Sequence, residues 1–223
     1  MSTISNLSTN PNIDAGARFS APLADLTRGR LEIREGISNL DLKGSSSSQD
    51  LFQAEFVGLI PHVRTQNGRV IISYQLSVVG WLKHALMGDH QAGEISLNTS
   101  IPWQIDIYGG VSHLDADLRE LPLSSITIMG GVADAELLLP RPSGTVQIHI
   151  ASGVSNLRII RPRGVHAQLK VAGGASHLVF DDQFYSSIGG GIQIGSPDYQ
   201  SQGVRYEITV SSGVSNLAVR TQE

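Results

Sequence analysis

Apolar and polar residues alternate in short segments through most of this chain. The clearest segments cover residues 104–107, 127–128, 147–150, 168–171 and 207–210. Strict alternation with a period of two predicts a β-strand that buries one face, because successive side chains of a strand point to opposite sides. The pattern therefore predicts a protein built from short strands, each with one apolar face.

A glycine-containing phrase follows these strands. The phrase reads Gly-Val-Ser-Asn-Leu or a variant of it, and it occurs six times, beginning at Gly36, Gly110, Gly131, Gly153, Gly174 and Gly213. Its apolar second residue recurs at 111, 132, 154 and 175, in steps of 21, 22 and 21 residues. A fixed period of this size indicates a repeat protein whose units stack on one another.

A second strand begins after each phrase. Its inward positions are predicted to be Leu114, Ala116, Leu118, Leu137, Leu139, Leu157, Ile159, Leu178, Phe180, Leu217 and Val219. Neither strand can cover its own apolar face, but stacked coils can pair like strands in parallel, about 4.8 Å apart, around a shared core. The predicted fold is therefore an all-β, single-domain β-solenoid of two-strand coils.

Two columns of apolar residues should line the inside of this stack. They are Ile107, Ile128, Ile150, Val171 and Val210 on one sheet, and Val111, Val132, Val154, Ala175 and Val214 on the other. Glycine at the corner between the two strands is expected to accept a positive φ.

A polar residue stands three positions after each corner glycine. These residues are Asn39, His113, Asp134, Asn156, His177 and Asn216. We expect them to hydrogen-bond the corner backbone, as Asn and Asp do in turns. Sequence order places His113 and His177 three coils apart, about 14 Å, which is too far for one shared zinc ion.

The period fails in three places. Residues 1–28 are predicted to be an N-terminal tail or cap, and the solenoid domain covers 29–223. Residues 51–93 form an irregular β insertion, with a hairpin turn at 66–69 and one or two helical turns at 81–90. The second insertion, 181–203, lengthens the last step to 39 residues. Only four residues follow Val219, so the last coil, residues 206–219, is expected to present an unpaired strand edge.

Composition narrows the possible partners. The net charge of −4 gives no reason to expect a nucleic acid. The absence of cysteine excludes disulfides and thiolate metal sites. No apolar run is long enough to span a bilayer, and the N-terminus does not read as a secretory signal. We therefore expect no direct membrane insertion, and either a cytoplasmic protein or the soluble part of a membrane-associated one.

From about residue 31 to 219 the chain resembles a known family. It is similar to the toast-rack β-solenoid domains at the C-terminus of LiaF-type cell-wall-active antibiotic response proteins and in related adhesin-like proteins. The matching residues are 31–33 before Gly36, 102–107 before Gly109-Gly110, and the later glycine repeats; Ile101-Pro102-Trp103 is the most specific. The resemblance implies a bacterial, non-catalytic module associated with cell-envelope stress, and it supplies no catalytic motif.

Three groups of residues invite a chemical interpretation. Asp115 with Asp117, and Asp181 with Asp182, are paired carboxylates of the kind used by glycosidases, but alternation places the first pair on a solvent-facing surface and the second in a loop. Arg141, Arg161 and Arg163 lie in successive closing loops and should share one edge. They and Trp81 are the candidate contacts for an anion or a protein partner, although a solvated edge is the simpler interpretation.

The sequence thus predicts no catalytic, cofactor or metal site. The leading hypothesis is a non-enzymatic binding or scaffold module that contacts an unknown protein partner. One alternative is a structural protein that assembles end to end through the solenoid ends, as a homo-oligomer. A third is a carbohydrate-active β-helix enzyme.

Overall fold

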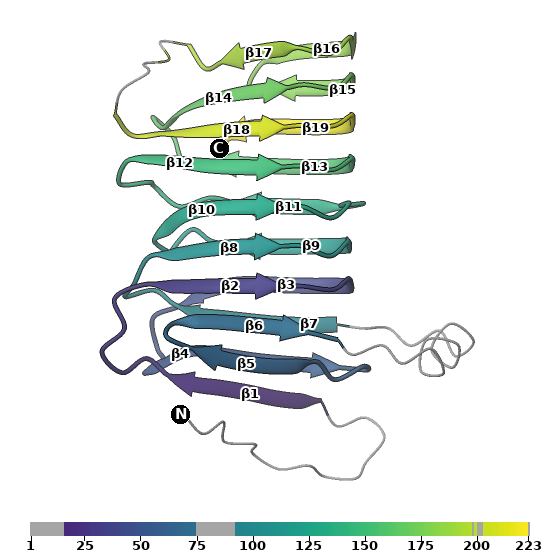
Figure 1. Ribbon diagram of the computed structural model, residues 1–223. Coiled ribbons are helices and arrows are strands. Elements are labelled where there is room, and N and C mark those ends of the chain that lie inside the picture. The colour runs from purple at the N-terminus through teal and green to yellow at the C-terminus, as the bar shows by residue number, and fades with distance from the viewer. Residues whose placement is uncertain (1–15, 75–91, 198, 200–202, 223) are drawn as a thin grey trace, which may run out of the picture.

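The computed structural model describes residues 16–74, 92–197, 199 and 203–222. These residues form two β-sheets that face each other along one stack (Figure 1). In spatial order, sheet A contains β1 (Ala17–Pro22), β4 (Asp50–Val57), β7 (Ala92–Asn98), β3 (Ile37–Ser45), β9 (Val111–Asp117), β11 (Ala135–Leu138), β13 (Val154–Arg161), β19 (Val214–Thr221), β15 (Ala175–Phe180) and β16 (Gln183–Ile188). Sheet B contains β17 (Ile192–Gly195), β14 (His166–Val171), β18 (Arg205–Val210), β12 (Thr145–Ile150), β10 (Leu123–Ile128), β8 (Trp103–Ile107), β2 (Gly29–Ile33), β6 (Arg69–Ser73) and β5 (His62–Gln66). The predicted all-β solenoid of two-strand coils is confirmed.

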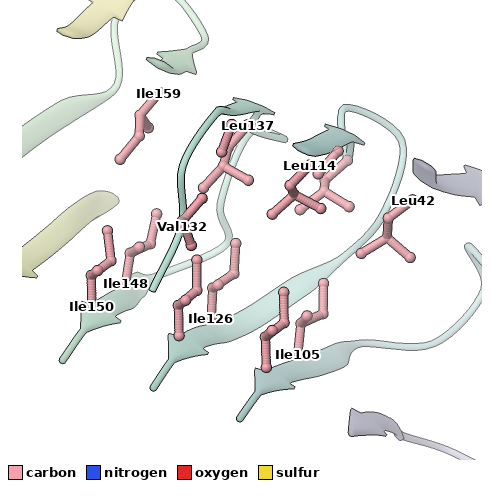
Figure 2. Packing of buried hydrophobic residues seen from close by; sticks show 14 of the residues in the cluster. Leu42, Ile105, Leu114, Ile126, Val132, Leu137, Ile148, Ile150 and Ile159 are labelled. Atoms are coloured by element: carbon pink, nitrogen blue, oxygen red, sulfur yellow. The ribbon is translucent and has the colours of Figure 1, made fainter. Parts of the chain in front are cut away.

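Parallel, in-register pairing builds the middle of the stack. Ile105, Ile126 and Ile148 are register partners on β8, β10 and β12. Figure 2 shows these isoleucines pointing toward Leu114, Leu137 and Ile159 of the opposite sheet. All ten residues of the two predicted inner columns are buried, with exposed fractions of 0 to 6%. The second-strand positions predicted to point inward are buried as well.

The order of the coils in space differs from their order in the chain. Strands β18 and β19 lie between the coil of β12 and β13 and the coil of β14 and β15 (Figure 1). The expectation that the last coil leaves an edge at one end is therefore wrong. The Tyr206 hydroxyl of β18 donates to the carbonyl of Pro140 at 2.6 Å, and this bond anchors the inserted coil to its neighbour.

The two irregular insertions occupy the ends of the stack. At one end β4 runs antiparallel to β7 and to β1, and β5 runs antiparallel to β6. The predicted hairpin turn is confirmed, with positive φ at Asn67 and Gly68. At the other end β16 and β17 fold back antiparallel to β15 and β14. The predicted helical turns at 81–90 fall outside the described residues, and no helix within those residues could cross a membrane.

Close backbone approach, rather than positive φ, explains the corner glycines. A Cβ added to Gly130 would lie 2.1 Å from the carbonyl oxygen of Gly109 in the coil beside it, whereas one added to Gly131 would lie 3.8 Å from its nearest neighbour. Neither residue has a positive φ. The expected role of these glycines is thus corrected: the first glycine of each Gly-Gly pair lets adjacent corners stack.

Trp103 fills the core where the regular coils begin. Its side chain is fully buried, and its indole N–H donates to the carbonyl of Asn98 at 2.8 Å. A Cβ on Gly29 would come within 2.6 Å of the indole ring. The Ile101-Pro102-Trp103 signature therefore works together with a glycine more than seventy residues earlier in the chain.

Candidate binding site

The polar corner residues pair with one another between coils. The amide of Asn216 donates to the side-chain oxygen of Asn156 at 2.8 Å, and His113 Nδ1 lies 3.1 Å from a carboxylate oxygen of Asp134. Asn156, His177 and Asn216 have φ values of 53 to 55°. Asn and His are among the residues that enter this left-handed region most readily. In these two pairs the side chains bond each other rather than the corner backbone expected from the sequence. The left-handed backbone explains why Asn or His stands at 156, 177 and 216.

The corner column does not assemble a metal site. His113 and His177 are separated by four strand steps rather than three, because β19 lies between β13 and β15. Within the described residues, no group of three or more His, Asp or Glu side chains could hold a metal ion.

The paired carboxylates are surface or structural groups. Asp115 is exposed, and Asp117 accepts two hydrogen bonds from the Arg119 guanidinium, at 2.8 and 2.6 Å, and one from the Arg119 backbone N–H at 3.3 Å. These bonds lower the pKa of Asp117. Asp181 pairs with Arg161 and accepts from Thr221 at 3.3 Å, whereas Asp182 is exposed in the turn before β16.

Two of the three arginines of the closing loops are exposed neighbours, and the third is buried. Arg161 is buried, with 4% of its surface exposed, and donates to the carbonyl of Val165 at 2.8 Å and to Asp181. Arg141 and Arg163 are exposed and donate to the carbonyls of Arg163 and Gln222 in neighbouring loops, at 2.7 and 3.1 Å. The predicted exposed edge therefore holds for Arg141 and Arg163 and is wrong for Arg161, which is turned inward. Trp81 lies outside the described residues.

The outer face of sheet A carries a feature that sequence reasoning missed. Two hollows of about 460 and 400 Å³ lie there and share Arg158 and Ala218 in their linings. We call them together the sheet A groove. Its apolar lining includes Leu138, Ile160, Ala218, Val179 and Phe184. Phe184 is 63% exposed, a large apolar surface to leave in water.

One row of register partners crosses this face and leads into the groove. The row runs Glu55, Glu94, Asp41, Asp115, Glu136, Arg158, Ala218, Val179 and Phe184. Arg18, Lys43 and Arg158 form ion pairs with Glu55, Glu94 and Glu136. Asp41 and Asp115 are exposed and have no partner among the described residues.

The sequence contains a pattern from which the groove could have been recognised. Alternation demands a polar residue at the outward positions, as Asp115 and Asp117 provide on β9. The runs Leu137-Leu138-Leu139 and Ile159-Ile160 break this rule by one apolar residue each. Such exceptions mark an outer face that is not simply solvated.

A larger and shallower hollow follows the repeated phrase itself. It has a volume of about 700 Å³ and is lined by the Gly-Val-Ser or Gly-Val-Ala residues of four neighbouring corners. Its lining is formed by glycines and small residues without a charged group. The sheet A groove, with its exposed aromatic ring and flanking charges, is the better candidate binding site.

Both the sequence and the fold of this chain are similar to those of known proteins. A family model, the N-terminal domain of toast_rack (DUF2154), matches residues 5–160. The solved structure of a putative cell adhesion protein from Clostridium sporogenes ATCC 15579 matches with a TM-score of 0.72 at 16% identity, over 94% of this chain and 100% of that one. No curated protein is significantly similar to this chain in sequence.

Two further solved structures are more distant. They are a putative adhesin from Bacteroides fragilis NCTC 9343, covering 93% of this chain and 97% of that one, and a putative lipid binding protein from Parabacteroides distasonis ATCC 8503, covering 96% and 98%. Both are 9% identical with a TM-score of 0.32, too low to carry an argument. The family model, which matches well over half of the sequence, and the first structure, which shares the fold, agree with the resemblance noted above: the chain belongs to the toast-rack family.

Proposed function

We propose that this toast-rack domain is a non-enzymatic binding module that holds a protein partner on the outer face of sheet A. The observation that carries the proposal is the sheet A groove, where each of four adjacent strands, β11, β13, β19 and β15, turns a partly exposed apolar residue outward. These residues are Leu138, Ile160, Ala218 and Val179. An apolar patch bordered by charged residues is typical of a protein-interaction surface.

The carboxylates farther along the same row indicate the charge of the partner. Asp41 and Asp115, unpaired within the described residues, extend the same row toward the opposite end of the sheet. A partner that sets an apolar patch on the groove and basic residues beside these carboxylates would satisfy both halves of the row. The partner in this proposal is therefore a protein with that combination.

The resemblance to LiaF-type proteins motivates a proposal for the cellular process in which this binding takes place. We propose that binding at the groove contributes to the response of a bacterial cell to envelope stress. A reporter of that response, measured after a cell-wall antibiotic is added, should lose amplitude in cells carrying Ile160→Glu. A response equal to that of the wild type would contradict this setting, even if the groove binds a partner.

A matched set of variants tests the binding itself. A photo-crosslinking residue is placed at 160 or 179 in the groove, and at 127 on the outer face of sheet B as a control. Adducts to one protein from 160 and 179, and none from 127, are expected. The purified partner should then bind Ile160→Glu at least tenfold more weakly than wild type. Equal adducts from all three positions, or unchanged affinity of Ile160→Glu, would refute the proposal.

A further inference from the structure

The two ends of the stack differ in how their edge strands are protected. At one end the edge strands are β1, which contains Arg18 and Pro22, and β5, which contains Arg64. At the other end they are β16, with the sequence QFYSSI, and β17, with the sequence IQIG. Charged residues and proline on edge strands oppose pairing with another chain. The end formed by β16 and β17 has neither within its strands.

The core is also incompletely covered at this end. Tyr185 and Ile188 of β16, and Ile192 of β17, pack against the core but remain partly exposed. Within the described residues, β16 pairs only with β15 and β17 only with β14. Two strand edges and the apolar residues between them are thus presented together.

The two exposed strand edges limit which kind of molecule can bind at this end of the stack. A single extended peptide could add a strand to one sheet only, because facing sheets lie about 10 Å apart. An occupant that continues both sheets must offer two uncharged edge strands at the same separation, with apolar residues between them. A second copy of the same end meets these conditions when it is rotated about a two-fold axis normal to the sheets.

We propose that the end formed by β16 and β17 is the interface of a homodimer, in which the edge strands of two copies pair antiparallel. The dimer is closed, because the end formed by β1 and β5 is charged and does not offer the same surface. Strands of four to six residues span only about 14–20 Å. The contact is therefore smaller than the ~800 Å² per partner of a standard interface. The dimer should accordingly dissociate on dilution.

This inference goes beyond the proposed function and is tested separately from it. Sedimentation velocity is measured from low micromolar to near-millimolar protein for three forms: wild type, Ser187→Lys with Gln193→Lys, and Ser20→Lys with Gln66→Lys. The second form places lysines on β16 and β17, and the third makes the same changes on β1 and β5. Wild type and the third form should double in mass as concentration rises, while the second stays monomeric with an unchanged Tm.

Other outcomes overturn the inference. A wild type that is monomeric throughout, or a second form that still dimerises, contradicts the assigned interface. A mass that keeps rising beyond the dimer contradicts closure. Because the chain lacks cysteine, single-cysteine variants give an independent measurement. A flexible bis-maleimide should crosslink two copies of Ser187→Cys but not of Ser20→Cys, and equal yields would refute the interface even if the lysine variants fail to fold.

Discussion

The outer face of sheet A divides into two halves that share one inner architecture. Strands β3 and β9 turn Asp41 and Asp115 outward, whereas β19 and β15 turn Ala218 and Val179 outward in the same row. The inner residues of all four strands are buried in one core. The fold therefore constrains the inner positions alone, and the outer positions are free to differ along the sheet.

The acidic half carries an electrostatic cost. Five carboxylates from Glu55 to Glu136 are successive register partners, and like charges directly opposite one another destabilise a sheet. Three of them are offset by basic partners, but Asp41 and Asp115 are not within the described residues. The stability of the fold does not explain why Asp41 and Asp115 stand side by side, whereas binding of a basic partner would explain it.

The largest expected effect tests the inner positions. Val154→Asp should abolish cooperative folding, because it leaves an unpaired charge in a site that is 5% exposed. Ser155→Ala, the adjacent outward position, should cost about 1 kcal/mol or less, since it removes a hydrogen bond of 2.8 Å to the carbonyl of Ala133 at the surface. Thermal unfolding measures both, and an unchanged Tm for Val154→Asp would contradict the inner column.

A smaller effect tests how the coils stack. Gly130→Ala should destabilise the domain by about 1–3 kcal/mol, because the new methyl group would meet the Gly109 carbonyl and push adjacent corners apart. Gly131→Ala serves as the control and should be nearly neutral. Urea unfolding of both variants checks this difference, and equal losses would show that the corner glycines are needed for another reason.

A charge reversal separates stability from binding. Asp115→Lys should stabilise the domain by about 0.2–1 kcal/mol, because it relieves repulsion from Asp41 and provides a cation beside Glu136. The same variant should bind the partner more weakly. Chemical denaturation and a binding titration on one sample test the pair of effects. A gain in affinity would contradict the basic partner.

The smallest effect concerns the pair of Asp117 and Arg119. The pKa of Asp117 is lowered in the folded state, so its contribution is present above the unfolded pKa of about 3.9 and is lost as the pH falls through the lower folded value. The Asp117 side chain is 39% exposed, so the contribution at neutral pH should be below about 1 kcal/mol. The stability difference between wild type and Asp117→Asn should therefore vanish in acid. A difference that grows as the pH falls would contradict this assignment.

The sequence revealed the inner architecture because burial imposes a strict period. Val111, Val132 and Val154 recur at nearly constant steps, and each is buried as predicted. The position of the last coil could not be read in the same way. A period orders coils along the chain, whereas the place of β18 and β19 depends on the excursion through β16 and β17 and on long-range pairing.

The candidate site was harder to predict than the fold. Arg161 was assigned to a solvated edge by its position beside a proline, yet continued alternation along β13 turns it inward, onto Asp181. Leu138 and Ile160 signalled the groove only as exceptions to alternation. Their meaning depends on which strands are neighbours, which a single sequence does not specify.

The central claim is that the apolar half of the outer face of sheet A binds the partner. Crosslinking from residue 160 compared with residue 41, on the same face of the same sheet, tests it most directly. The account predicts an apolar contact at 160 that persists at high salt, and a contact at 41 that is lost as salt screens its charge. Salt-sensitive contact at both positions, or none at 160, would contradict the account.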